Sequence, residues 1–104
     1  MMTLLDCPLL VFDTGPLKGQ KVRVRKTITI GRHPDNDISI EDPSASRHHA
    51  RVEVTESGLV LADAESGNGT YLNGEKVTGA SKLMPGDRIR IGRTEFVLLE
   101  SDAK

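Results

Sequence analysis

Aromatic residues are scarce in this sequence, and tryptophan is absent. Phe12, Tyr71 and Phe96 make up 3% of the 104 residues. A hydrophobic core without large rings has to be assembled mainly from valine, isoleucine and leucine. The β-branched members of that set fit the half-buried surface of a pleated sheet better than they fit a helix. The shortage of aromatics therefore favours strands.

Cysteine and long apolar runs are nearly missing as well. The chain has one cysteine, Cys7, which excludes a disulfide bond within the chain. No apolar run approaches the roughly 20 residues that a transmembrane helix needs. The first residues lack the basic segment and the long apolar stretch of a secretory signal peptide. We therefore expect a cytoplasmic protein that does not enter a membrane.

Neither basic nor acidic residues are in excess. The chain carries 14 basic and 15 acidic residues, so its net charge is −1. Such a balanced chain has no overall field that would draw it to nucleic acid or to an anionic membrane. Neither is expected as a partner, and any site for an anion must be local.

Size and composition indicate one domain. A chain of 104 residues with 37% hydrophobic and 28% charged residues can bury a single core of its own. We place the domain at residues 8–100. Residues 1–7 are expected to form a flexible N-terminal segment, and residues 101–104 a frayed C-terminus.

Apolar and polar residues alternate in several short segments, which is the pattern of half-buried strands. The pattern occurs in residues 21–25, 27–30 and 38–40. Two pairs of longer segments predict hairpins, namely residues 50–54 with 59–62 and residues 88–91 with 95–99. No window has helical spacing, so no substantial helix is expected. The fold class is all-β, a sandwich or a small barrel with mostly antiparallel strands.

Three loops carry polar residues that strand packing does not require. We call residues 31–37 the first polar loop, residues 41–49 the second and residues 64–70 the third. In a sandwich, loops that follow alternate crossings emerge at the same end of the molecule. The three polar loops are therefore expected to converge.

The polar loops are rich in hydrogen-bond donors. They hold the guanidinium groups of Arg32 and Arg47, the hydroxyl of Ser46, the amide of Asn68 and several glycine N–H groups. Donors without a buried carboxylate suit an anion, and the guanidinium fork matches the oxygens of a phosphate. Their convergence would create a phosphate site.

The order and spacing of these residues resemble the signature of the forkhead-associated (FHA) domain family. The likeness consists of Gly31-Arg32, S-x-x-H from Ser46 to His49, and N-G-T-x-x-N-G from Asn68 to Gly74. It extends to Asp37-Ile38, to Pro85-Gly86-Asp87-Arg88-Ile89 and to Gly92, and covers roughly residues 8–100. The resemblance implies a two-sheet β-sandwich of about eleven short strands. Its loop end would bind phosphothreonine in partner proteins that a Ser/Thr kinase has modified.

The resemblance also implies which residues bind the phosphate. Arg32 and Ser46 would contact it directly, with Arg47 and the backbone N–H of Gly67 beside them. Many members of the family have Ser or Thr at the position of Gly67. A side-chain hydroxyl is missing there, so we expect weaker binding.

Other residues would contact the peptide around the phosphothreonine or support the loops. Asn68 would bond the peptide backbone, while His33 and Ser44 would influence which peptide is preferred. The residues expected to support the loops are Gly31, His49, Gly69, Thr70 and Asn73. A phosphorylated Thr3 that blocks the site of its own chain is disfavoured. The seven residues before the first strand, at about 3.3 Å each, are too few to reach the loops.

Other functions were weighed against phosphopeptide binding. A phospho-independent interaction or oligomerisation module would need a contiguous apolar patch. Asp42, Ser46 and His49 are the residue types of a hydrolase triad, but nothing resembles a nucleophile elbow, so no enzyme is predicted. Adjacent His48 and His49 point to opposite faces of a strand, which argues against a metal site. No cofactor and no small-molecule substrate are expected.

Overall fold

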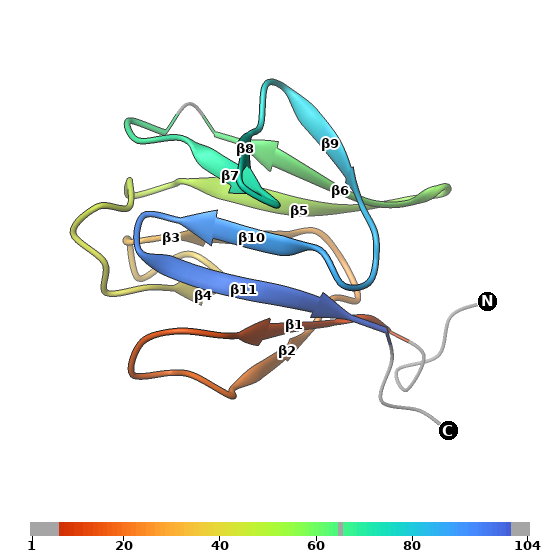
Figure 1. Ribbon diagram of the computed structural model, residues 1–104, viewed down its shortest axis with the longest axis horizontal. Helices are drawn as coiled ribbons and strands as arrows, with labels where there is room; N and C mark the ends of the chain where they lie inside the picture. The colour runs from red at the N-terminus through yellow and green to blue at the C-terminus, as the bar shows by residue number, and fades with distance from the viewer. Residues whose placement is uncertain (1–6, 65, 101–104) are drawn as a thin grey trace.

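The structure, a computed structural model, describes residues 7–64 and 66–100, which form eleven strands in two sheets (Figure 1). The six-stranded sheet comprises, in spatial order, β2 (Lys21–Arg23), β1 (Leu9–Phe12), β11 (Thr94–Leu99), β10 (Arg88–Ile91), β7 (Thr70–Leu72) and β8 (Glu75–Lys76). The five-stranded sheet comprises β4 (Ile38–Ser39), β3 (Ile28–Gly31), β5 (Ala50–Thr55), β6 (Gly58–Asp63) and β9 (Ala80–Leu83). The predicted all-β sandwich is confirmed, and these residues include no helix that could cross a membrane.

Strand pairing is antiparallel except between β3 and β4, which run parallel with Ile30 opposite Ile38. Both predicted hairpins are present, β5 with β6 and β10 with β11. The alternation of residues did not single out β9, because only Leu83 of this edge strand is buried. A turn at Asn73-Gly74 joins β7 to β8. Its φ angles of 51° and 87° are both positive, as a type I′ turn requires.

The core lies between the two sheets and is built almost entirely from aliphatic side chains. Ile30 and Leu61 from one sheet, and Ile89 and Phe96 from the other, are each 0% exposed. Burying a side chain of this size stabilises a fold by about 1.5–3 kcal/mol. The alternating residues of the strands thus supply the inner faces of the sandwich, and the polar loops are left to its ends.

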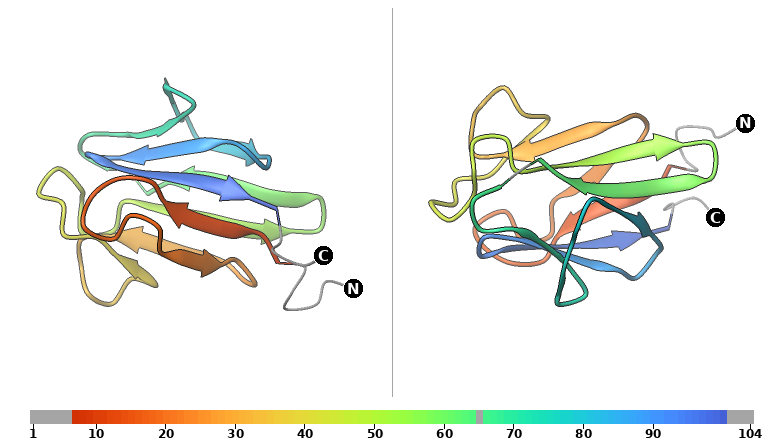
Figure 2. Two further views of the ribbon diagram at one scale, coloured as in Figure 1. Left: turned by 60° about the horizontal axis from the view of Figure 1, so that its bottom comes forward. Right: turned by 90° about the horizontal axis from the view of Figure 1, so that it is seen from above.

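Five connections emerge at one end of the sandwich, which we call the loop end. They follow β1, β3, β4, β6 and β10, and they include all three polar loops (Figure 1). At the opposite end β1 begins and β11 ends, and both views in Figure 2 keep this separation. The predicted convergence of the polar loops is therefore observed.

The chain ends lie largely beyond the described residues. Thr3 and residues 101–104 are not among them, so the predictions made for these positions fall outside the structure. Cys7, which belongs to the predicted N-terminal segment, is buried at 4% exposure. The strands run from residue 9 to residue 99, inside the predicted domain of residues 8–100.

Candidate functional site

Arg32 follows β3 directly and lies against the second polar loop. Its backbone N–H donates to the carbonyl of Ser46 at 3.0 Å, and its side-chain Nε donates to the carbonyl of Ala45 at 3.0 Å. Within the described residues it forms no ion pair with a carboxylate. The guanidinium is thus held in place through one nitrogen, and its positive charge remains uncompensated.

Gly31 permits this close approach of the first and second polar loops. A Cβ atom at Gly31 would lie 2.2 Å from the carbonyl oxygen of Arg47, closer than any real contact. The buried amide of Asn36 reinforces the junction, because its Nδ2 donates to the carbonyls of His33 at 2.8 Å and Arg47 at 2.7 Å. Glycine is required here by space rather than by backbone conformation.

His49 joins the second polar loop to the third. Its imidazole is 0% exposed, and its Nδ1 accepts the N–H of Ser46 at 3.0 Å. Since Nδ1 accepts, the proton of a neutral ring is on Nε2, which donates to the carbonyl of Gly69 at 2.8 Å. His49 therefore links the backbone of Ser46 to the backbone of Gly69.

Ser46 and Asn68 complete the contact between these two loops. The hydroxyl oxygen of Ser46 accepts the N–H of Gly67 at 3.0 Å, and Nδ2 of Asn68 donates to the carbonyl of Ser44 at 2.7 Å. The second loop therefore lies between the first and the third and is bonded to both. Arg32, Ser46 and Asn68, which are far apart in the sequence, come together at the loop end.

Asp63 organises the third loop from within. One carboxylate oxygen, Oδ1, accepts the hydroxyls of Ser66 at 2.6 Å and Thr70 at 2.7 Å, and Oδ2 accepts the N–H of Ser66 at 3.1 Å. Burial raises the pKa of Asp63, but the hydrogen bonds from Ser66 and Thr70 outweigh it and leave the pKa below its ordinary 3.8. Thr70 thus bonds the carboxylate that holds the third loop. Sequence reasoning missed the part of Asp63.

Asp42 fixes the second loop against the turn between β10 and β11. It is 5% exposed. Oδ1 accepts the N–H of Ser44 at 2.8 Å, and Oδ2 accepts the N–H of Arg93 at 2.7 Å and the hydroxyl of Thr94 at 3.0 Å. Burial raises the pKa of Asp42, but these hydrogen bonds outweigh it and lower the pKa below 3.8. Sequence reasoning missed this role, although an Asp that accepts the N–H two residues on is an Asx turn.

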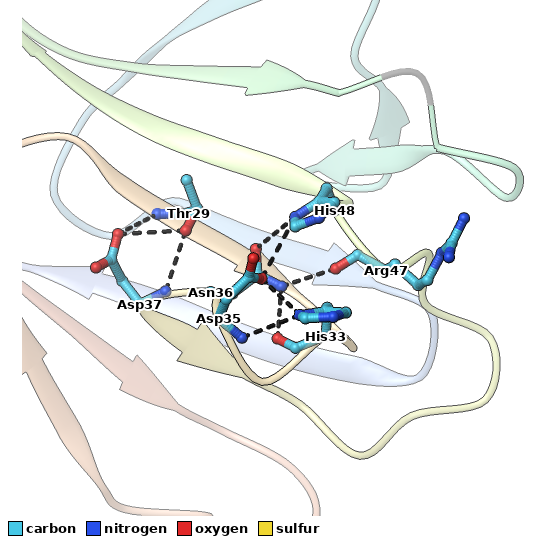
Figure 3. A network of polar contacts seen from close by, with 7 residues as sticks. All are labelled: Thr29, His33, Asp35, Asn36, Asp37, Arg47 and His48. Atoms are coloured by element: carbon cyan, nitrogen blue, oxygen red, sulfur yellow. Dashed lines mark hydrogen bonds and ion pairs between the residues drawn. The ribbon is translucent and has the colours of Figure 1, made fainter.

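Another group of predicted residues lies on the outer side of the first loop. The rings of His33 and His48 are stacked with centroids 5.6 Å apart, and Oδ1 of Asp35 lies 2.7 Å from Nδ1 of His33 (Figure 3). Figure 3 shows the guanidinium of Arg47 pointing away from this group. His49 is buried elsewhere, so the three histidines do not meet.

Asn73 lies apart from the polar loops. Its Oδ1 accepts the N–H of Arg88 at 2.9 Å, and its Nδ2 donates to Asp87 at 3.0 Å. These bonds fasten the turn between β7 and β8 to the start of β10. Asn73 therefore supports that turn, and it makes no hydrogen bond to the first or second polar loop.

A family model described as the FHA domain matches residues 28–92 of the sequence. The chain belongs to the FHA domain family. The matched segment includes all three polar loops and strands β3 to β10, so the resemblance noted in the sequence is confirmed over these parts of the chain.

Known proteins similar to this FHA domain include one named as an enzyme inhibitor and one solved with a phosphopeptide. It is 38% identical over 97 residues to the oxoglutarate dehydrogenase inhibitor of Corynebacterium glutamicum, an alignment that covers 92% of this chain and 67% of that protein. EmbR of Mycobacterium tuberculosis, solved with a low-affinity phosphopeptide, superposes with a TM-score of 0.84 at 31% identity, over 94% of this chain and 25% of EmbR. A structure from a study of phosphothreonine-dependent FHA domain interactions superposes with a TM-score of 0.83 at 30% identity. The superposition covers 93% of this chain and 99% of that one.

The steric requirement at Gly31 of the FHA domain can be tested by mutation. Gly31→Ala should lower the free energy of unfolding by about 1–3 kcal/mol, because the new methyl group must push back the carbonyl of Arg47. Gly67→Ala is the matched control, since its Cβ would meet only Ser46 Oγ, at 3.9 Å. Urea unfolding at pH 7 measures both, and equal stabilities would contradict the prediction.

The carboxylate of Asp42 should make stability depend on pH. Asp42→Asn leaves an amide facing three donors, so we expect a loss of about 1.5–3 kcal/mol at pH 7. The folded-state pKa is depressed, so this contribution is complete above the unfolded value of 3.8 and disappears as the pH falls through the lower folded value. Urea unfolding from pH 7 to pH 2 should show that the free energies of unfolding of the unmutated chain and of Asp42→Asn converge below pH 3.8. A constant difference would refute the assignment.

Proposed function

We propose that this FHA domain binds phosphothreonine in partner proteins at its loop end, with Arg32 and Ser46 on the phosphate and Asn68 on the peptide backbone. The observation that carries the proposal is the state of Arg32. Its guanidinium is anchored through Nε to Ala45, has no carboxylate partner among the described residues, and lies beside the Ser46 loop. A fixed, uncompensated guanidinium is suited to a dianionic group.

The chemistry of a phosphorylated side chain matches these donors. A phosphothreonine carries a charge of about −1.5 to −2 at pH 7 and presents three acceptor oxygens. The two terminal nitrogens of Arg32 can donate to two oxygens at once. Ser46 accepts from Gly67 and still has its own hydroxyl proton to donate. Charge-assisted bonds of this kind contribute about 1.5–3 kcal/mol each, less the cost of ordering the peptide.

Gly67 was expected to contact the phosphate through its backbone N–H, but that N–H is bonded within the domain. Its N–H donates to the Ser46 hydroxyl, which orients that hydroxyl rather than leaving the N–H open. With no side-chain hydroxyl at position 67, the phosphate depends mainly on Arg32 and Ser46. This supports an affinity weaker than that of family members with Ser or Thr at the same position.

The known relatives support a role as an adaptor that acts by binding. One relative is named an inhibitor of an enzyme, and a solved neighbour was captured with a phosphopeptide. We infer that this chain likewise recruits or regulates a protein that a Ser/Thr kinase has phosphorylated, and that it catalyses no reaction itself. Neither relative favours the phospho-independent alternative.

Loss of Arg32 should abolish most of the affinity. Arg32→Ala is expected to weaken binding of a phosphothreonine peptide at least thirtyfold, or about 2 kcal/mol, and Ser46→Ala about tenfold. Fluorescence anisotropy with a labelled peptide gives the dissociation constants. Arg25→Ala is the control, because Arg25 is an exposed arginine between β2 and β3, at the opposite end. Full binding by Arg32→Ala, or an equal loss in Arg25→Ala, would refute the site.

The phosphate and the methyl group of the ligand should each be recognised. Phosphothreonine should bind about fivefold better than phosphoserine if its methyl is buried, a difference of about 1 kcal/mol. Affinity should fall by up to about tenfold between pH 7 and pH 5, because the phosphate takes up a proton near pH 6. Calorimetric titrations measure the affinity for each peptide and at each pH. Binding of an unphosphorylated peptide with equal affinity would exclude the proposed function.

A further inference from the structure

The end of the sandwich opposite the loop end, which we call the far end, carries exposed apolar side chains. Among residues 7–64 and 66–100, the large apolar side chains that are exposed are Val54 at 38%, Met84 at 54% and Leu99 at 42%. Val54 is the last residue but one of β5, Met84 follows β9 directly, and Leu99 ends β11. Figure 1 shows that β5, β9 and β11 all end on the side of the molecule where β1 begins. Apolar groups gathered at one place on a surface commonly mark a contact site.

A hollow at the far end lies beside these side chains. It has a volume of about 290 Å³, and its apolar lining includes Pro8, Val54, Leu59, Met84, Pro85 and Leu98. The one charged residue among the described residues of its lining is Lys82. An apolar cavity of about 150 Å³ in a protein interior already binds benzene. The hollow therefore has room for an aliphatic side chain.

The walls of the hollow are held by hydrogen bonds of their own. Oδ2 of Asp87 accepts the N–H of Met84 at 2.8 Å in the turn between β9 and β10. The hydroxyl of Thr55 donates to the carbonyl of Gly58 at 2.8 Å in the turn between β5 and β6. Walls that are already ordered lose little conformational freedom when a side chain enters.

The chain enters the domain at this hollow. Pro8 lines it, and the carbonyl of Pro8 accepts the N–H of Val24 at 2.9 Å, which fixes the point from which the preceding residues leave. Residues 1–6 lie outside the described residues, and their sequence is Met-Met-Thr-Leu-Leu-Asp, in which four of six side chains are apolar. At about 3.3 Å per residue, the Cα atom of Leu5 is at most about 10 Å from that of Pro8, and the Cα atom of Leu4 at most about 13 Å. Both leucines can therefore reach the hollow.

The C-terminal residues suit the hollow less well. Residues 101–104 follow β11 but read Ser-Asp-Ala-Lys, without a large apolar side chain. The charged side chain in residues 1–6 is that of Asp6, which is opposite in sign to Lys82 in the lining. Composition, charge and reach together select residues 1–6 as the occupant.

We propose that residues 1–6 dock on the far end of their own domain, with Leu4 or Leu5 in the hollow. This docking does not depend on the proposed function, because no residue of the three polar loops lines the hollow. It covers the exposed apolar groups of the far end and holds Thr3 at the end of the molecule opposite Arg32. The domain thus keeps its own first residues away from the proposed phosphopeptide site.

The contact can be observed by nuclear magnetic resonance in the full chain, labelled with carbon-13 in the methyl groups of methionine and leucine. We expect a nuclear Overhauser effect between the methyl group of Met84 and those of Leu4 or Leu5, and Met84→Leu identifies the methionine signal. The effect should be equally strong over a tenfold range of protein concentration, because both partners belong to one molecule. A mixture of labelled and unlabelled chains tests for the same contact between copies.

Variants measure what the contact contributes to stability. Leu4→Ser/Leu5→Ser should lower the thermal midpoint by about 4–8 °C, because apolar surface that was buried against the far end returns to water. Thr3→Ser is the matched control, because it changes the same stretch of chain without removing a leucine, and it should shift the midpoint by less than about 1 °C. Met84 is exposed, so Met84→Ser should stay folded. In that background the double leucine variant should lower the midpoint by less than half as much, because one partner of the contact is gone.

Each result decides for or against the docking. A concentration-independent Overhauser effect, together with the reduced shift in the Met84→Ser background, establishes it. Absence of the effect in the unmutated chain overturns it, and so does a shift of the thermal midpoint that is the same with and without Met84. An effect that grows with concentration and appears between labelled and unlabelled chains means that the hollow takes up part of a second copy, which also overturns the proposal.

Discussion

The buried imidazole of His49 is the contact on which the loop end depends. It bonds the backbone of Ser46 through one nitrogen and that of Gly69 through the other. Because the ring is 0% exposed, both bonds lie in a medium where they are strong and where losing either would leave a buried polar group unpaired. The hydroxyl of Ser46 and the amide of Asn68 owe their mutual position to this link, and the sandwich core beneath makes it rigid.

The charge at the loop end depends on which groups its carboxylates bond. Asp42 and Asp63 are both turned toward N–H and hydroxyl donors of the loops themselves, and these hydrogen bonds lower their pKa values. They shape the second and third polar loops without neutralising Arg32 or Arg93. A chain with a net charge of −1 can therefore present a locally cationic surface. The family to which the chain belongs, and its likeness to a domain captured with a phosphopeptide, fit this distribution of charge.

Much of the fold and part of the site followed from short-range patterns. Alternating residues predicted β3, β5, β6, β10 and β11, because a strand exposes its two faces in turn whatever it pairs with. The edge strand β9 was not predicted, because it buries only one apolar residue and its sequence does not alternate. Asp63 was missed for a different reason: an aspartate at the end of a strand looks the same in the sequence whether it faces solvent or the donors of the loop that follows. Asn73 was assigned to the polar loops, although its bonds are to Asp87 and Arg88.

The sequence alone determined the class of fold, the residue types of the site and the family they resemble, because these depend on periodicity and on the spacing of a motif. Only the tertiary structure decided which polar groups meet. Ser46 and Gly67 are 21 residues apart and Arg93 is 51 residues from Asp42, yet each pair shares a hydrogen bond. Such contacts are set by how two sheets stack and at which end their loops emerge.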